Sequence, residues 1–266
     1  MTVLSAWQTA ERTTTPPKSA GVLAQVVYDY EFWITQPERR DAIQRALGRT
    51  DVAHVATSGV VEHMLAEIGA VPIATIPAGL AAGEFGVDVA IDARRSVVGF
   101  ARRYQPSKDP GTALEAIEEI HQQVPETTFV CFGDAADATL PDWVERLGRV
   151  TPGELRDFYN RCAVFLLTSK VEGWGLPALE AMACGATVVS TASGGVEDFL
   201  VHDVNGLIVP VGDASKVASE AIDLLLARER RIRLAERAVQ DTRQLTTERS
   251  LDRLEVLLAE RVHPAP

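Results

Sequence analysis

The stretch Ser169–Phe199, SKVEGWGLPALEAMACGATVVSTASGGVEDF, decides the fold that the sequence predicts. The apolar run AVFLL at 163–167, just before it, is typical of a buried strand, and a glycine-rich turn follows. Pro177 suits the first position of a helix, which Gly185 would end. A second strand is expected at 187–190. Strand, glycine turn, helix and strand make the repeating unit of a parallel α/β sheet.

The glycine-rich turn is the candidate ligand-binding element. Glycines let the backbone approach a ligand closely, and the free amides at a helix start favour an anion such as a phosphate. Glu172 lies in the turn and Glu180 lies in the helix after it. A carboxylate accepts hydrogen bonds from the vicinal hydroxyls of a ribose or a hexose. The alternative is a plain strand–helix turn, in which Glu172 is only an N-terminal charge and Glu180 is solvated.

Composition sets limits on the class of protein. The 266 residues suffice for one large domain, or for one domain and part of another. A net charge of −11 argues against a general nucleic-acid binder. The 3 cysteines form no CxxC pair and the 5 histidines show no ligand spacing, so no metal site is predicted. Because no apolar run approaches the ~20 residues that span a bilayer, and the N-terminus does not read as a signal peptide, we expect a cytoplasmic protein without a transmembrane segment.

Strands alternate with helices along the chain. Strands are predicted at 2–5, 25–31, 52–56, 71–77, 97–101, 127–132, 163–167, 187–190 and 206–210. Helices are predicted at 38–47, 60–68, 110–124, 152–161, 176–184, from 214, and on to about 262, and a loop is predicted at 13–17. The predicted helix caps are Ser58, Asp213, and Thr151 with Glu154 as a capping box. From about 94 to 227 this pattern predicts one complete doubly wound, Rossmann-like domain, whose ligands bind at the carboxyl ends of the strands.

The residues of the opening stretch carry a resemblance to a known family. Glu172-Gly-Trp-Gly-Leu-Pro177 and Glu180-Ala-Met-Ala-Cys-Gly185, followed by Ser193-Gly-Gly195 and Glu197, resemble the signature of the retaining glycosyltransferases of family 4. The resemblance implies the GT-B architecture of two Rossmann-like domains. It also implies transfer of a sugar from a nucleoside-diphosphate-sugar donor to a hydroxyl of a glycan or lipid-linked acceptor. The segments 5–10 and 28–31 are similar to the rhamnan and O-antigen branch of that family.

The resemblance assigns roles to individual residues. Arg103 and Lys108 match the spacing of the pair that holds the donor diphosphate, with Arg102 as a near-equal competitor for the arginine's place. No cofactor is expected, since these cations would stabilise the leaving nucleoside diphosphate, a task that a divalent ion performs elsewhere. Glu180 would bind the ribose hydroxyls. Glu172, the predicted catalytic residue, would contact the transferred sugar.

The remaining predicted donor contacts come from main chain and glycines. The resemblance places the base against the Gly133 turn and the main chain near Val150. It also implies that Gly173 contacts the donor and that the amides of Gly175 and Leu176 face phosphate or sugar. Trp174 either borders the sugar site or only wedges the loop.

The predicted domains are a partial, acceptor-side α/β domain at 1–92 and a donor-binding domain at 93–266, which includes the C-terminal helices. Since the first resembles only the last third to half of a family N-terminal domain, we expect either a transferase or a nucleotide-sugar-binding fragment that is non-catalytic or depends on a partner chain. A sugar-nucleotide epimerase is disfavoured by the pair Glu172 and Glu180. The arginine-rich segment 228–253 also contains acids, which favours a solvated helical face over a nucleic-acid or lipid site.

Overall fold

The computed structural model describes residues 2–4, 23–28, 38, 40–133 and 140–262. The chain divides into two compact units. The first unit comprises Met1–Gly79, Glu172–Trp174 and Leu245–Pro266, and the second comprises Leu80–Val171 and Gly175–Gln244. These bounds differ from the predicted domains 1–92 and 93–266, because 80–92 group with the second unit and the last helix with the first.

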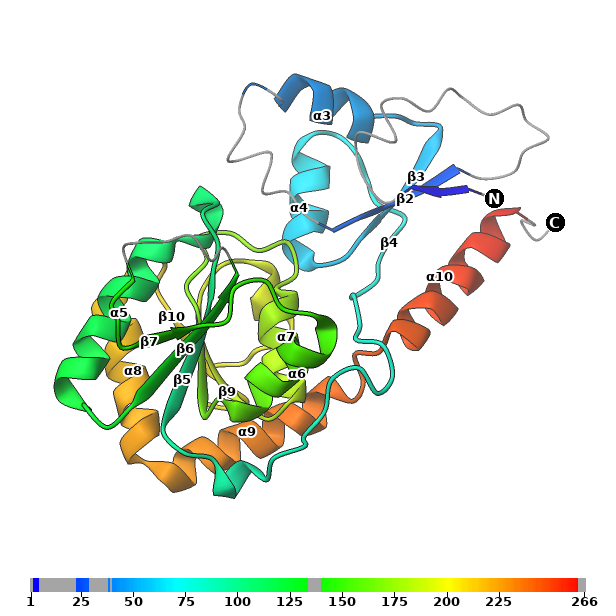
Figure 1. The fold of residues 1–266 in the computed structure, drawn as a ribbon. Helices are drawn as coiled ribbons and strands as arrows, with labels where there is room; N and C mark the ends of the chain where they lie inside the picture. Colours follow the sequence, from blue (N-terminus) through cyan, green and yellow to red (C-terminus); the bar gives the residue numbers. More distant parts are fainter. Residues whose placement is uncertain (1, 5–22, 29–37, 39, 134–139, 263–266) are drawn as a thin grey trace. The chain divides into compact units, whose positions relative to one another are not determined.

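The described strands of the second unit form one parallel sheet of six strands (Figure 1). They are β5 (Val97–Arg102), β6 (Thr128–Gly133), β7 (Val144–Arg146), β8 (Val164–Leu167), β9 (Thr187–Thr191) and β10 (Leu207–Val209). Their order is β10-β9-β8-β5-β6-β7. Successive strands are added on one side of β5 up to β7 and on its other side from β8 onward, so the strand order reverses between β5 and β8. This arrangement confirms the predicted doubly wound fold. In such sheets the ligand crevice lies outside the carboxyl ends of the strands at this switch point.

Helices cover both faces of this sheet. They are α5 (Pro110–Gln123), α6 (Pro152–Arg161), α7 (Leu176–Ala183), α8 (Ala214–Leu226) and α9 (Arg228–Thr242), with the 3-10 turns η3 (Ile91–Ala93), η4 (Pro106–Lys108) and η5 (Gly195–Asp198). The helices α5 and α8 pack together over one face, where their apolar side chains join those of β5, β6 and β8 in one buried core (Figure 1). The helix α6 packs beside α7, and its Phe158 approaches the sheet at Gly99.

Helix starts follow the predicted capping signals. Thr151 and Glu154 form a reciprocal capping box at the start of α6, and the Asp213 carboxylate caps α8 by accepting from the Lys216 amide. Such caps are each worth roughly 0.5–2 kcal/mol. Both elements therefore begin where the sequence indicated.

The described part of the first unit holds a parallel sheet of order β1-β2-β3-β4. Its strands are β1 (Thr2–Leu4), β2 (Leu23–Val27), β3 (Val52–Ala56) and β4 (Ala74–Thr75), and its helices are α3 (Arg40–Leu47), α4 (Gly59–Glu67) and α10 (Thr247–Val262). Apolar side chains of α3 and α4 pack on β2 and β3 in one buried cluster. Ser58 caps α4 by accepting from the Val61 amide, as predicted.

The structure differs from the local predictions in three places. The strand expected at 71–77 is only the two-residue β4. β7 was not predicted, because two of its three residues are exposed and charged. Pro177 is the second residue of α7, since Leu176 is the first. The helical pattern predicted to continue to about 262 is confirmed, and it forms two helices, α9 and α10. The predicted loop at 13–17, the segment 5–10 and residues 29–31 lie outside the described residues.

Candidate functional site

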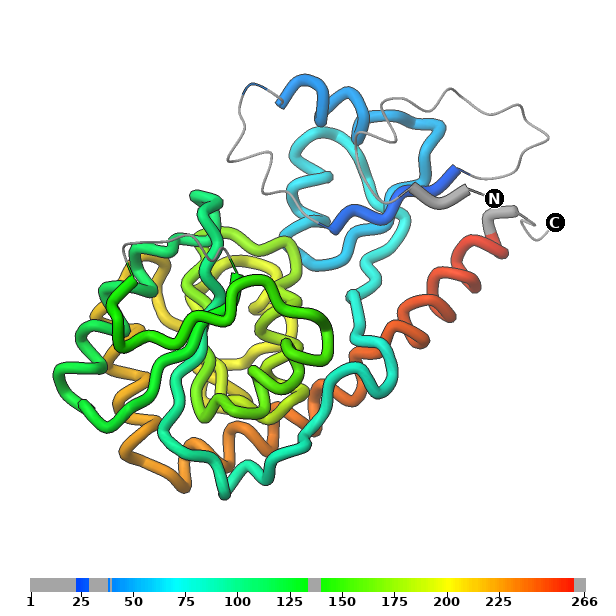
Figure 2. Tube along the Cα trace, viewed as in Figure 1, coloured from blue at the N-terminus to red at the C-terminus, as the bar shows by residue number. Residues whose placement is uncertain are grey.

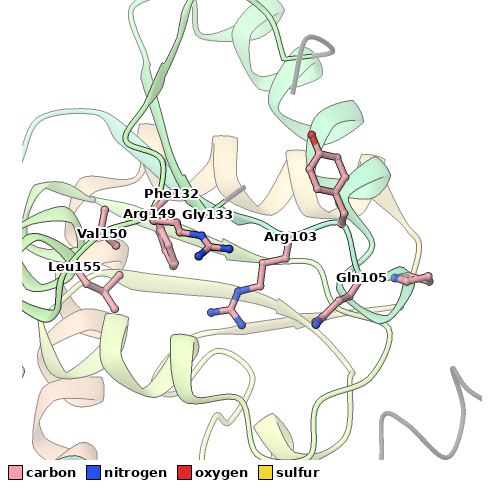
Figure 3. Close-up of a pocket in the computed structure, with 9 residues that line it drawn as sticks. Arg103, Gln105, Phe132, Gly133, Arg149, Val150 and Leu155 are labelled. Carbon is pink, nitrogen blue, oxygen red and sulfur yellow. The ribbon is translucent and has the colours of Figure 1, made fainter. Parts of the chain in front are cut away.

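One cavity of about 720 Å³ lies at the carboxyl ends of β5, β6 and β7 in the second unit (Figure 3). Three predicted donor-binding residues line it, Arg103, Gly133 and Val150. The other lining residues are Tyr104, Gln105, Pro106, Phe132, Arg149 and Leu155. The described structure thus brings the loop after β5, the Gly133 turn and the segment near Val150 around one space, at the carboxyl edge of the sheet, the edge at which doubly wound sheets bind ligands.

The structure separates the roles of two adjacent arginines. Arg103 is exposed, and Figure 3 shows its guanidinium group and that of Arg149 projecting into the same space. Arg102 is buried, donates to the Pro110 carbonyl at 3.1 Å and lies 5.5 Å from the centre of the Tyr104 ring. Of the two, Arg103 is the residue available to a ligand in the cavity.

Gly133 is required by the backbone at the end of β6. Its φ is +124°, and a Cβ there would lie 2.0 Å from the Arg102 carbonyl oxygen. Its amide donates to the Gly148 carbonyl at 2.8 Å. Glycine therefore lets β6 end close beside β5, which forms the floor of the cavity.

Glu180 is held by a neighbouring helix. The Tyr159 hydroxyl of α6 donates to Glu180 Oε2 of α7 at 2.8 Å. Burial raises the pKa of the Glu180 carboxyl, the Tyr159 hydrogen bond lowers it, the Glu84 charge raises it and the Arg103 charge lowers it. Glu180 is therefore not the solvated helix residue of the alternative interpretation, and Arg103 is its cationic neighbour.

The turn before α7 is split between the compact units. Gly175, with φ +94°, caps α7, and a Cβ there would lie 2.4 Å from Val196 Cγ2. The Gly175 carbonyl accepts from the Ala178 and Leu179 amides. Leu176, the first residue of α7, is exposed. Gly175 and Leu176 belong to the second unit with Glu180, whereas Glu172, Gly173 and Trp174 group with the first.

Residues 172–174 have their own anchor in the first unit. The Ser58 hydroxyl, at the start of α4, donates to the Gly173 carbonyl at 2.6 Å. Glu172 and Trp174 are both buried, at 5% and 4% exposure.

Lys108 is not among the described residues that line the cavity. It is the last residue of η4, and its amide donates to the Gln105 carbonyl at 2.9 Å. The next residue, Asp109, has φ +41° and precedes α5, and its side chain accepts from Thr112 Oγ1 at 2.8 Å. This bend turns the chain back after the cavity-lining loop.

Sequence reasoning missed Arg149, Phe132, Leu155 and Tyr159. Arg149 was hidden because an isolated arginine before a predicted main-chain contact reads as a surface charge. Phe132 and Leu155 read as core residues. Tyr159 reaches the site through its hydrogen bond to Glu180, 21 residues later, and through its ring contact with Phe132, and no local pattern signals such contacts.

The arginines, cysteines and possible metal ligands of the described residues have structural surroundings of their own. In the arginine-rich segment, Arg230 pairs with Asp203 and Arg237 with Asp241, as expected of a solvated face. Cys131, Cys162 and Cys184 are buried free thiols. No group of three or more His, Cys, Asp or Glu side chains within the described ranges is arranged to hold a metal ion. None of the helices described here combines the length and apolar character needed to cross a bilayer.

Comparison with known proteins assigns the family. Residues 85–241, which include the cavity, match the family Glycosyl transferases group 1. This match covers more than half of the chain, so the protein belongs to the Glycosyl transferases group 1 family.

Curated relatives carry glycosyltransferase names. A D-inositol 3-phosphate glycosyltransferase of Corynebacterium efficiens is 27% identical over 91% of this chain and 65% of its own length. The D-inositol 3-phosphate glycosyltransferase of Segniliparus rotundus is 31% identical over 54% of this chain and 35% of its own. A GDP-mannose-dependent phosphatidylinositol monomannoside mannosyltransferase of Mycobacterium tuberculosis is 26% identical over 75% of this chain and 59% of its own. The chain therefore spans between 35% and 65% of the length of these relatives.

Solved structures show the same fold. HepE of Anabaena, in complex with UDP-glucose, matches with a TM-score of 0.74 at 19% identity, covering 88% of this chain and 72% of HepE. Sucrose-phosphate synthase of Thermosynechococcus elongatus matches with a TM-score of 0.77 at 19% identity, covering 97% and 72%. The parallel α/β fold is thus that of GT-B glycosyltransferases, as the sequence predicted.

Proposed function

We propose that this chain is a retaining glycosyltransferase of family 4 that moves a sugar from a nucleoside-diphosphate-sugar donor to a hydroxyl group. One observation carries the proposal: the cavity at the carboxyl ends of β5–β7 is lined by Arg103, Gly133 and Val150. These are the residues to which the signature resemblance assigned the diphosphate and the base. The cavity volume of about 720 Å³ also lies within the range of ~300–1,000 Å³ that is usual for small-molecule sites.

Each donor group then has a partner of matching chemistry. Arg103 binds the diphosphate, for which a guanidinium fork suits phosphate oxygens, and Lys108 adds a movable charge. The Gly133 turn and the main chain at Val150 hold the base. Glu180 accepts from the ribose hydroxyls.

The reacting end of the donor meets the glycine-rich turn. Glu172 contacts the transferred sugar, and the amides of Gly175 and Leu176 face phosphate or sugar. The bond from the anomeric carbon to the diphosphate breaks, and a bond to the acceptor oxygen forms with the same configuration. Arg103 and Lys108 offset the charge that develops on the leaving diphosphate, so we propose that no metal ion is needed.

The named relatives support a nucleotide-sugar donor, since the mycobacterial mannosyltransferase is GDP-mannose-dependent and the HepE structure contains UDP-glucose. We further propose a glycan or lipid-linked glycan as acceptor, in a cytoplasmic setting.

Thermal unfolding with UDP, GDP and dTDP tests the donor site. A nucleotide at ~100 times its dissociation constant should add about 2.7 kcal/mol of stability. We expect this gain with one base, its loss in Glu180→Ala, and its retention in Glu118→Ala, a control that removes an exposed carboxylate of α5. No gain with any of the three nucleotides would reject the donor site.

Turnover tests the reaction itself. With the sugar form of the nucleotide that binds, we expect release of the nucleoside diphosphate, equal with added Mg²⁺ or with EDTA. Loss of turnover in EDTA would reject the metal-independent mechanism. Binding without turnover would assign the alternative, a nucleotide-sugar-binding chain that works only with a partner chain.

A further inference from the structure

A buried tyrosine is bonded to the carboxylate that we assign to the ribose. Tyr159 is 0% exposed, and its hydroxyl donates to Glu180 Oε2 at 2.8 Å. Neither the diphosphate nor the base requires this tyrosine, and it does not line the cavity. Its hydroxyl is the one polar group of a side chain otherwise packed among aromatic rings, so its partner determines what it does.

Aromatic packing fixes the position of that hydroxyl. The Tyr159 ring meets four phenylalanine rings edge to face, at centroid distances of 5.2 to 6.1 Å, namely Phe85, Phe132, Phe158 and Phe165. Phe132 also lines the cavity. One rigid cluster therefore connects the wall of the base site with the residue that holds Glu180, and a ring held on several edges has little freedom to turn.

The charged groups around Glu180 come from three elements. Tyr159 lies on α6, Arg103 follows β5, and Glu84 lies in the segment that leads to η3. Burial raises the pKa of the Tyr159 hydroxyl well above its usual range, and the Glu180 charge raises it further. Tyr159 thus stays protonated and donates to the ionised Glu180 carboxylate, so Glu180 is the member of this pair that titrates first as pH changes.

We propose that Tyr159 is a positioning residue for donor binding, which holds Oε2 of Glu180 so that the carboxylate presents Oε1 to the ribose hydroxyls. This inference rests on the proposed function and names the group that makes the site select a ribonucleotide. A carboxylate on a free side chain would rotate, and part of the binding free energy would be lost in ordering it. Tyr159 removes that cost before the nucleotide arrives.

The hydroxyl also favours the ionised form of Glu180. Glu180 is half-buried, and this desolvation raises the pKa of its carboxyl, whereas the Tyr159 hydrogen bond acts in the opposite direction. An ionised carboxylate accepts from both ribose hydroxyls, whereas a protonated one has lost part of its acceptor capacity. Selection of ribose should therefore fade as pH falls through the pKa of Glu180, and without Tyr159 it should fade at a higher pH.

The experiment compares a ribonucleotide with its 2′,3′-dideoxy form, which lacks both hydroxyls. Calorimetry gives the dissociation constants of the two for wild type and Tyr159→Phe between pH 5 and pH 8. Because hydrogen bonds to charged groups are the stronger kind, we expect the preference for the ribonucleotide to fall about tenfold in Tyr159→Phe. The affinity for the dideoxy form should stay unchanged, and the loss of preference should begin at a higher pH.

Two further variants separate positioning from mere packing. Tyr28→Phe removes the hydroxyl of an exposed tyrosine of the first unit, and we expect no change in either affinity. Adding Tyr159→Phe to Glu180→Gln should leave the preference where Glu180→Gln alone puts it, because Tyr159 acts only through Glu180.

Three results would overturn the inference. Equal weakening of both nucleotides by Tyr159→Phe would make the tyrosine a packing residue. Additive effects of Tyr159→Phe and Glu180→Gln would show that it acts elsewhere. If the Tyr159→Phe variant does not fold, the Glu180→Gln variant gives the test instead. A pH-dependent preference for the ribonucleotide that persists in Glu180→Gln would then overturn the inference. By contrast, a wild type that binds no nucleotide would reject the proposed function itself.

Discussion

Replacement of Arg94 by methionine should destabilise the second unit strongly. Arg94 is 7% exposed, although it precedes β5 in a segment with the charge pattern of a surface loop. Its guanidinium donates to the Cys162 carbonyl at 2.8 Å, the Val89 carbonyl at 3.2 Å and the Tyr159 carbonyl at 3.3 Å. It also donates to the Cys184 carbonyl and, at 3.5 Å, to Asn160 Oδ1. Arg94 therefore joins the ends of α6 and α7 to the segment that runs from Leu80 into β5. The backbone of that segment can be followed in Figure 2, where its colour passes from cyan to green.

The magnitude follows from the acceptors left behind. Methionine fills much of the space but donates no hydrogen bond, and each buried carbonyl that loses its partner costs about 1–3 kcal/mol. Some of these carbonyls have a second donor, such as the Tyr159 carbonyl, which also accepts from the Cys162 amide. We therefore expect the free energy of unfolding to fall by about 3–5 kcal/mol in total. At ~2–4 °C per kcal/mol, the melting temperature should fall by roughly 10 °C.

Urea unfolding followed by circular dichroism measures this loss. Arg233→Met is the matched control, because Arg233 is an exposed residue of α9, and its effect should stay within about 0.5 kcal/mol. Nucleotide affinity should also weaken in Arg94→Met, since the helix ends that it joins belong to the helices that carry Tyr159 and Glu180. A stability loss below ~1 kcal/mol would refute the argument, because the carbonyls would then find other partners at no cost.

Two other changes test the cavity floor and the buried carboxylate. Gly133→Ala should cost about 2 kcal/mol or more in urea unfolding, because the new Cβ meets the Arg102 carbonyl and φ is +124°. The control Gly153→Ala meets no atom within 4 Å and should be neutral or slightly stabilising, so equal effects of the two would contradict the account. Glu180→Gln should raise the free energy of unfolding at pH 7.5, because the folded-state pKa of Glu180 is raised by burial and the charged form is disfavoured. That advantage should shrink as pH falls through the raised pKa toward 4.5, since the wild-type carboxyl then becomes neutral; an advantage that grows on acidification would contradict the sign.

Much of the fold could be predicted because its signals are local. Apolar runs such as 164–167 gave the central strands, and Thr151 with Glu154 marked the start of α6 before any contact was known. β7 escaped prediction because a short edge strand carries no alternating apolar pattern. Helix and strand signals of this kind depend on residues a few positions apart, so they can be recognised without knowledge of the packing.

The site was predictable only where a motif marked it. Arg103, Gly133 and Val150 were identified from the family signature and spacing, and the cavity contains all three. The choice between Arg103 and Arg102 needed coordinates, because the direction of a strand end decides which side chain is buried. Arg94 was not found because a buried arginine with main-chain partners looks, in sequence, like any exposed one.

The last helix also has a consequence for the order in which the chain folds during synthesis. The Thr247 hydroxyl donates to the Gly79 carbonyl at 3.0 Å, across 168 residues, and the Ser250 hydroxyl donates to the Pro77 carbonyl at 2.6 Å. Both bonds lie within the first compact unit. At ~5–20 residues per second, a ribosome adds the partner roughly ten to thirty seconds after Gly79. The second unit, whose last residue is Gln244, is therefore fully synthesised while the first still lacks its closing helix, so the unit that begins earlier in the chain is the one that finishes later.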